Sequence, residues 1–128
     1  MTKDKGSFVL FGLSNCEATI NEIIKNIDAE QMYFDIKLIL MEAISNAFIH
    51  GNNKDENKSI HVRYTFDGSI VVFEIEDCGQ GLDAIQIPNE ISEDNYLDES
   101  GRGLFLIKCY CDKLELKSDG LIIYKTIR

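Results

Sequence analysis

The spacing of hydrophobic residues along the chain predicts where it forms helices. Apolar residues recur every three or four positions, the period of one helix face, in three segments: residues 14–27, 30–50 and 104–112. The first predicted helix starts at Ser14, whose hydroxyl would form a capping box with Glu17. The second is expected to stop at Gly51, because glycine commonly ends helices.

Short apolar or alternating runs predict the strands, at residues 7–13, 59–66 and 69–77, with a closing hairpin at 113–127. The Asp67-Gly68 pair between the second and third runs is typical of a two-residue hairpin turn. The element order is β-α-α-β-β-α-β-β, with a long connection before the last helix. This order predicts an α+β fold, a two-layer α/β sandwich whose mixed, mostly antiparallel sheet carries helices on one face.

Size and composition restrict the class of protein. A chain of 128 residues, 45% hydrophobic and 27% charged, predicts one globular domain spanning residues 1–128. The formal net charge of −9, without a basic cluster, argues against direct nucleic-acid binding. The N-terminal apolar stretch is too short to span a membrane and lacks a signal-peptide cleavage pattern. We therefore expect a cytoplasmic protein with no membrane attachment.

Cysteine spacing gives no indication of a metal site. The four cysteines include no C-x-x-C pair, which is the spacing typical of zinc sites. We expect them to be reduced thiols, as in most cytosolic proteins.

The second predicted helix carries two polar side chains among its apolar residues. Glu42 and Asn46 lie about 40° apart on a helical wheel, on a stripe flanked by hydrophobic positions. A buried carboxylate without a partner is costly, so this stripe is expected to meet a ligand, a metal or a cavity. An exposed helix edge would explain the same pattern without any function.

Two glycine-rich motifs follow, at the two ends of the long connection at residues 78–103. Asp77 ends a strand on its core-facing side, and Gly79-x-Gly81 then allows backbone to approach a bound group closely. An ordinary turn has the same composition. Later, Gly101-Arg102-Gly103 precedes the helix that opens at Leu104. Free N–H groups at such a start favour an anion, although a flexible helix entry explains it equally well.

Taken together, the three motifs resemble a known family. The stretches EAISNAFIHG, EIEDCGQG and SGRGLFLIK match, in order and spacing, the N, G1 and G2 boxes of the GHKL ATPase superfamily (Bergerat fold). Within it, the chain resembles the small anti-sigma-factor serine/threonine kinases (RsbW- and SpoIIAB-like). The resemblance covers residues 7–127 and implies a histidine-kinase-like ATPase fold.

The resemblance also implies ATP and Mg²⁺ as cofactors and assigns roles to residues. Asn46 would bind Mg²⁺ and the ATP phosphates, Glu42 would be the catalytic base, and Asp77 would bind the adenine amino group. Backbone beside the nucleotide would come from the glycine motifs, namely Gly79, Gly81, Gly101, Arg102, Gly103 and Leu104. Residues 82–100 would form a lid over the nucleotide. Arg102 would contact either phosphate or a protein partner.

The final hairpin departs from the family pattern. Members usually carry a Gly-Thr pair there, whose hydroxyl helps to hold adenine, whereas this chain has Gly120-Leu121-Ile122. Thr126 lies too late in the hairpin to replace that hydroxyl. Asp77 would therefore bind adenine without this help, so the expected nucleotide affinity is lower than in members with the Gly-Thr pair.

The resemblance implies an ATP-dependent protein serine/threonine kinase. It would phosphorylate a small anti-sigma antagonist, alternately sequester a sigma factor, and form a homodimer as its relatives do. One alternative is a nucleotide-dependent partner-switching module without catalysis. Another is the ATP-binding subunit of a split histidine kinase, which would be shown by a histidine phosphoacceptor on a partner.

Overall fold

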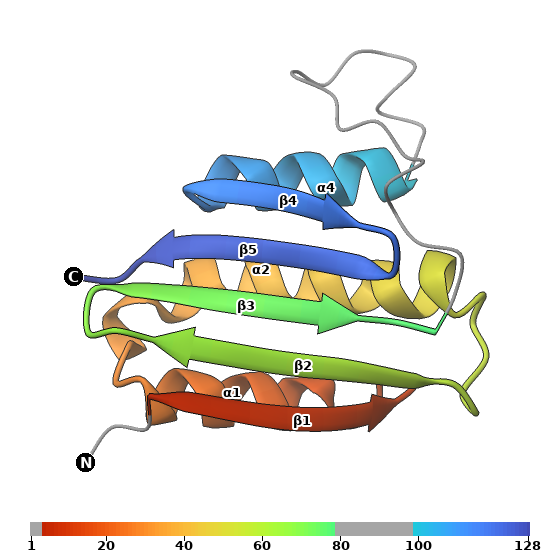
Figure 1. Cartoon of the computed structure of the whole chain (residues 1–128), viewed down its shortest axis with the longest axis horizontal. Helices are drawn as coiled ribbons and strands as arrows, with labels where there is room; N and C mark the ends of the chain where they lie inside the picture. The colour runs from red at the N-terminus through yellow and green to blue at the C-terminus, as the bar shows by residue number, and fades with distance from the viewer. Residues whose placement is uncertain (1–3, 79–98) are drawn as a thin grey trace.

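A five-stranded sheet forms one layer of the protein (Figure 1). The computed structural model describes residues 4–78 and 99–128. The strands are β1 Lys5–Phe11, β2 Ser59–Phe66, β3 Ile70–Glu76, β4 Lys113–Lys117 and β5 Gly120–Thr126. Their order across the sheet is β1-β2-β3-β5-β4, and every pairing between these strands is antiparallel.

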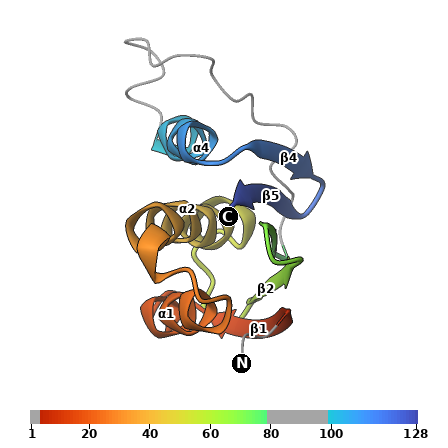
Figure 2. The same ribbon diagram turned by 90° about the vertical axis from the view of Figure 1, so that its left-hand side faces the viewer.

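The helices form the second layer, on one face of the sheet, as Figure 2 shows from the side. They are α1 Cys16–Asn26, α2 Tyr33–Asn46 and α4 Glu99–Tyr110. Two short turns flank α2, the 3-10 turn η1 Glu30–Met32 and the π turn η2 Ala47–Gly51. The predicted α+β fold and the predicted order of elements are therefore confirmed. No helix within residues 4–78 and 99–128 has the length and apolar character needed to cross a membrane.

The core lies between the two layers, because strand residues alternate between the faces of the sheet. Val62 of β2 pairs with Ile75 of β3, and Phe73 of β3 pairs with Ile123 of β5. All four are buried, and isoleucines of α1 and α2 close the core from the helical side. Burial of this apolar surface is the main source of stability.

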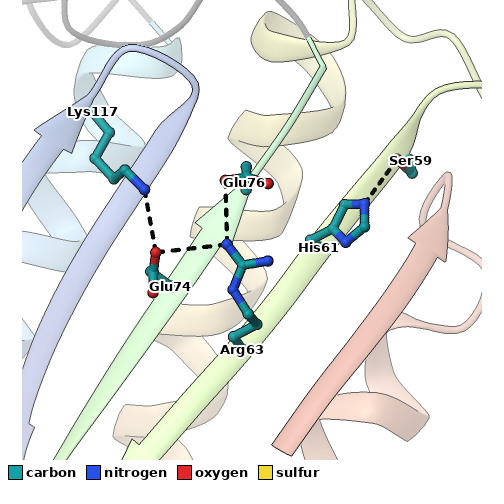
Figure 3. A network of polar contacts seen from close by, with 6 residues as sticks. All are labelled: Ser59, His61, Arg63, Glu74, Glu76 and Lys117. Atoms are coloured by element: carbon teal, nitrogen blue, oxygen red, sulfur yellow. Dashed lines mark hydrogen bonds and ion pairs between the residues drawn. The ribbon is translucent and has the colours of Figure 1, made fainter.

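The opposite face of the sheet carries a network of charged and polar side chains (Figure 3). Arg63 of β2 lies 3.2 Å from Glu76 and 3.6 Å from Glu74, and Lys117 of β4 lies 3.2 Å from the same Glu74 carboxylate. Next to them, His61 Nε2 lies 3.2 Å from the Ser59 hydroxyl. Half-exposed ion pairs of this kind each contribute only about 0–1 kcal/mol.

Two local predictions had different outcomes. The predicted hairpin turn is present one residue later than expected, because Asp67 pairs with Ile70 and the two turn residues are Gly68 and Ser69. The Asp67 carboxylate accepts hydrogen bonds from the N–H groups of Ser69 and Ile70. The predicted capping box is wrong. Helix α1 begins at Cys16, two residues later than expected, so Ser14 precedes the cap position and no side chain caps the helix.

Candidate functional site

Helix α2 carries the two polar side chains that the sequence places at the centre of the site. Its sheet-facing side is apolar, and Ile36, Leu40 and Ala43 are fully buried there. Glu42 is half-buried, whereas Asn46, the last residue of α2, is only 5% exposed. The helix thus holds Asn46 inside the protein and leaves Glu42 at the boundary with solvent.

The first part of helix α4 lies directly against these two side chains. A Cβ atom added to Gly103 would lie 2.8 Å from Glu42 Oε2 and 3.1 Å from Asn46 Nδ2. Leu104 and Ile107 are fully buried and hold α4 in the helical layer beside α2. Glycine at position 103 therefore allows α4 to approach a carboxylate and an amide at the same place.

Helix α4 begins at Glu99, five residues before the predicted start at Leu104. The prediction was wrong because two glycines inside a helix cost about 1 kcal/mol each, and the packing of α4 against α2 offsets that cost. Gly101 and Arg102 consequently belong to the first four residues of the helix. The first N–H groups of an α-helix point away from its body toward its N-terminus, so an anion site at this turn is consistent with the new boundary.

One buried atom of this cluster has no hydrogen bond. Within the described residues, nothing accepts a hydrogen bond from Asn46 Nδ2. Leaving a buried amide donor unsatisfied costs about 1–3 kcal/mol. A ligand that uses the amide would account for that cost, and Asn46 also offers an oxygen of the kind that Mg²⁺ binds. The residues present therefore fit a magnesium nucleotide.

The described residues contain no group of three or more His, Cys, Asp or Glu side chains placed to hold a metal ion. All four cysteines are free thiols. Mg²⁺ usually takes one or two protein oxygens together with nucleotide phosphates and water. A magnesium site at Asn46 accordingly requires no acidic cluster.

Asp77 occupies a second part of the site, immediately after strand β3. It is only 5% exposed and shares the buried side of the strand with Phe73 and Ile75, as strand alternation predicts. Its backbone N–H donates to the carbonyl oxygen of Asp119 at 2.7 Å. The carboxylate lies so close to Gly51 that a Cβ atom on Gly51 would overlap it.

Gly51 is a site residue whose role the sequence analysis missed. It was expected to stop the second helix, and the helical segment does end there, although the backbone turns to positive φ only at Asn53 and Lys54. Gly51 ends the π turn η2 and is buried against Asp77. Since Asp77 lies 26 residues further along the chain, no local pattern indicates this contact.

The final hairpin places an apolar side chain where the family usually has a hydroxyl. Gly120 pairs with Glu76 of β3, and a Cβ atom there would overlap the carbonyl oxygen of Ile75. The next residue, Leu121, is buried in the core. Thr126 lies at the opposite end of β5 from Gly120, so it is too distant along the strand to supply the hydroxyl.

The structure thus gathers the described site residues into two groups. Glu42, Asn46 and Gly103 come together where α2 meets α4, and Asp77 lies against Gly51 after the π turn. Gly79, Gly81 and residues 82–98 of the expected lid lie outside the described residues. The last two expected lid residues belong to helix α4.

Curated proteins similar to this chain include two that are named anti-sigma F factor. The protein of Geobacillus sp. (strain WCH70) is 28% identical over 87 residues, covering 66% of this chain and 60% of the relative. The protein of Clostridium perfringens (strain SM101 / Type A) is 30% identical over 87 residues, covering 66% and 62%. The matched part therefore spans about 60% of the length of these relatives.

The match to a protein family is more extensive. The family described as histidine kinase-like ATPase domain matches residues 14–126, which include both groups of site residues. Membership of an ATPase family implies ATP as the nucleotide, and the antiparallel sheet with helices on one face agrees with that fold. The chain belongs to the histidine kinase-like ATPase domain family.

Proposed function

We propose that the chain is an ATP-dependent protein serine/threonine kinase. It phosphorylates a small anti-sigma antagonist and alternately binds a sigma factor. The observation that carries the proposal is the convergence of Glu42, Asn46 and Gly103 where α2 meets α4. The similarity to proteins named anti-sigma F factor supports the class of partner.

Asn46 holds the magnesium nucleotide in this proposal. Its side chain is fixed by burial, and its Nδ2 atom has no acceptor within the described residues. Mg-ATP supplies a phosphoryl group whose charge the metal partly neutralises. The N–H groups of Gly101 and Arg102 at the start of α4 bind phosphate oxygens, because the helix terminus is positive.

Glu42 acts as the general base. Its carboxylate is half-buried and lies beside Gly103, next to the residues of α2 and α4 that hold the phosphates in this proposal. From there it accepts the proton of a serine or threonine hydroxyl on the protein substrate and holds that hydroxyl in position. Phosphoryl transfer depends mainly on such positioning and on charge stabilisation.

Asp77 binds adenine in this proposal. Its buried carboxylate accepts a hydrogen bond from the amino group of the base. Leu121 replaces the usual hydroxyl by an apolar side chain. Recognition of the base therefore depends more heavily on Asp77 than in relatives with the Gly-Thr pair.

Phosphotransfer from radiolabelled ATP to the cognate antagonist tests the kinase. Wild-type protein is expected to label the antagonist on serine or threonine. Glu42→Gln, which keeps the size of the side chain, is expected to lower the rate at least tenfold with little change in ATP affinity. Equal labelling by wild type and Glu42→Gln contradicts the role of Glu42.

The same experiment distinguishes the two alternatives. Partner release on nucleotide exchange without any phosphoprotein would identify a partner-switching module. An acid-labile phosphate on a partner histidine would identify a split histidine kinase, because phosphoserine and phosphothreonine survive acid.

A homodimer is part of the proposal, and the face of the sheet opposite the helices is its interface. Val9 and Phe11 of β1 are 52% and 57% exposed there. Such a patch of large apolar side chains favours association. Phe11→Glu is expected to give a monomer by light scattering, whereas Phe34→Glu, at a still more exposed position on α2, leaves the dimer intact. A dimer that survives Phe11→Glu rejects this interface.

A further inference from the structure

Asn52 is a polar residue with no accessible surface, and it follows the π turn directly. Its Nδ2 atom donates to the carbonyl oxygens of Lys58 at 3.2 Å and Ser59 at 3.0 Å. Its Oδ1 atom accepts from the backbone N–H of Cys78 at 2.8 Å. One side chain therefore joins the end of α2 to the start of β2 and to the residue after Asp77.

The bond to Cys78 bears directly on Asp77. The Cys78 N–H and the Asp77 carbonyl belong to one planar peptide group, so holding the N–H restricts the ψ angle of Asp77. On the other side, the Asp77 N–H is bound by Asp119 O at 2.7 Å. Both peptide groups that flank Asp77 are thus fixed, one from the β4–β5 turn and one from Asn52.

Gly51 completes this arrangement, since it lies against the Asp77 carboxylate itself. Gly51 and Asn52 are adjacent in sequence, so the same short segment limits the position of the carboxylate and the orientation of its backbone. A carboxylate held in this way presents its acceptor oxygens in one direction.

We propose that Asn52 is a positioning residue that sets the base selectivity of the nucleotide site by orienting Asp77. The inference rests on the proposed function, in which Asp77 binds adenine. Adenine offers an amino group to a carboxylate, whereas guanine has a carbonyl oxygen at the corresponding position and is repelled. A carboxylate that loses its fixed direction tolerates guanine better and binds adenine less well.

The oxygen and the nitrogen of the Asn52 amide make different hydrogen bonds. Two substitutions can therefore distinguish orientation of Asp77 from support of the loop at residues 53–58. Asn52→Ala removes both the Cys78 bond and the bonds to the loop. Asn52→Asp keeps an acceptor for the Cys78 N–H, but it loses the donor to the two carbonyl oxygens and places a carboxylate oxygen beside them. Both variants are expected to be less stable than wild type, but only Asn52→Ala frees the backbone beside Asp77.

The test measures the dissociation constants of Mg-ADP and Mg-GDP by calorimetry, at a temperature where circular dichroism shows each variant folded. Wild type is expected to prefer ADP. In Asn52→Ala the preference is expected to fall at least tenfold, with GDP affinity changed less than threefold. Asn52→Asp is expected to keep most of the preference. Asp112→Ala is the matched control. It also removes a hydrogen bond between a side chain and a backbone N–H, that of Thr126, but at the end of β5 that lies away from Asp77.

The outcomes separate the inference from the proposed function. A folded Asn52→Ala that keeps the wild-type preference overturns the role of Asn52 and leaves the kinase proposal standing. If Asn52→Ala does not fold, Asn52→Asp decides, and its loss of preference overturns the inference. A wild-type protein without preference for ADP rejects both. Loss of the ADP preference in Asp112→Ala would show that lowered stability alone removes the preference. That result would also overturn the inference about Asn52.

Discussion

Two glycines each face a carboxylate in this protein. The two carboxylates differ in how far they could move away from a side chain added to the glycine. Gly51 meets the whole carboxyl group of Asp77, a short side chain on a backbone fixed on both sides. Gly103 faces Oε2 of Glu42, the far end of a longer side chain at the boundary with solvent, and the amide of Asn46.

This difference divides the site into a rigid part and an adjustable part. The part assigned to adenine is held by backbone hydrogen bonds of the fold, so its geometry is complete before a nucleotide binds. Glu42 has the longer side chain and lies at the boundary with solvent, where it can meet a substrate hydroxyl. A rigid group suits recognition, and a mobile one suits proton transfer to a partner protein. Substitutions in the two parts should therefore differ in size and in kind.

The largest effect is expected from Asn46→Ala, which replaces the buried residue beside Glu42. Mg-ATP affinity should fall about 100-fold, equivalent to about 2.7 kcal/mol, while metal-free ADP binds nearly as before. Stability should not fall, because the substitution removes a buried donor that has no acceptor within the described residues. Calorimetry with and without EDTA, combined with thermal unfolding, measures both. Unchanged Mg-ATP affinity would remove Asn46 from the site.

Gly51→Ala should have the next largest effect. The new Cβ overlaps a carboxylate that cannot withdraw, so ADP affinity should fall about 30-fold, or about 2 kcal/mol. The fold should also lose about 1–3 kcal/mol from overpacking. Gly68→Ala is the control, since a Cβ there meets nothing within 4 Å. The control should lose stability from its φ of +97° but keep its nucleotide affinity.

Gly103→Ala should show a smaller effect of a different kind. The end of the Glu42 side chain can shift, but the new Cβ would also lie 3.1 Å from Asn46 Nδ2. ATP affinity should therefore fall about threefold, while phosphotransfer slows about tenfold. Alanine is also a better helix residue than glycine, which should raise stability by up to about 1 kcal/mol. A fall in affinity as large as that of Gly51→Ala would contradict the proposed difference between the two parts.

Asp67→Asn should have the smallest effect, because Asp67 lies in the β2–β3 turn outside both parts. Hydrogen bonds from Ile70 and Ser69 lower the pKa of the Asp67 carboxyl. A lowered folded pKa means that the stabilisation is present above the unfolded pKa of about 3.9. It is lost as the pH falls through the folded pKa. The difference in Tm between wild type and Asp67→Asn should therefore be small at pH 7 and vanish in acid, with nucleotide affinity unchanged.

Most of the fold could be predicted from sequence because its signals are local. Strand alternation and the Asp67-Gly68 turn identify the β2–β3 hairpin, and helical spacing identifies α1 and α2. The same reasoning brings Glu42 and Asn46 onto one stripe, since residues four apart share a helix face.

Other features depend on partners distant in the chain, so local patterns miss them. The start of α4 was misplaced because glycines at 101 and 103 discourage a helix until α2 packs against it. Asn52 looks like an ordinary loop residue, yet its side chain bonds to Cys78, 26 residues away. The contact of Gly51 with Asp77 was missed for the same reason, because it is long-range.

The π turn at Ala47–Gly51 acts as a spacer between the two parts of the site. It is closed by the Asn52 N–H bonding to Ala47 O at 2.8 Å, five residues back rather than four. The wide turn sets the angle about the helix axis between Asn46 and the Gly51-Asn52 pair. Removing one residue from it would leave Asn46 in place and swing Gly51 and Asn52 away from Asp77. In the proposed function, the length of this single turn therefore sets the distance between the residue assigned to the phosphates and the residue assigned to adenine.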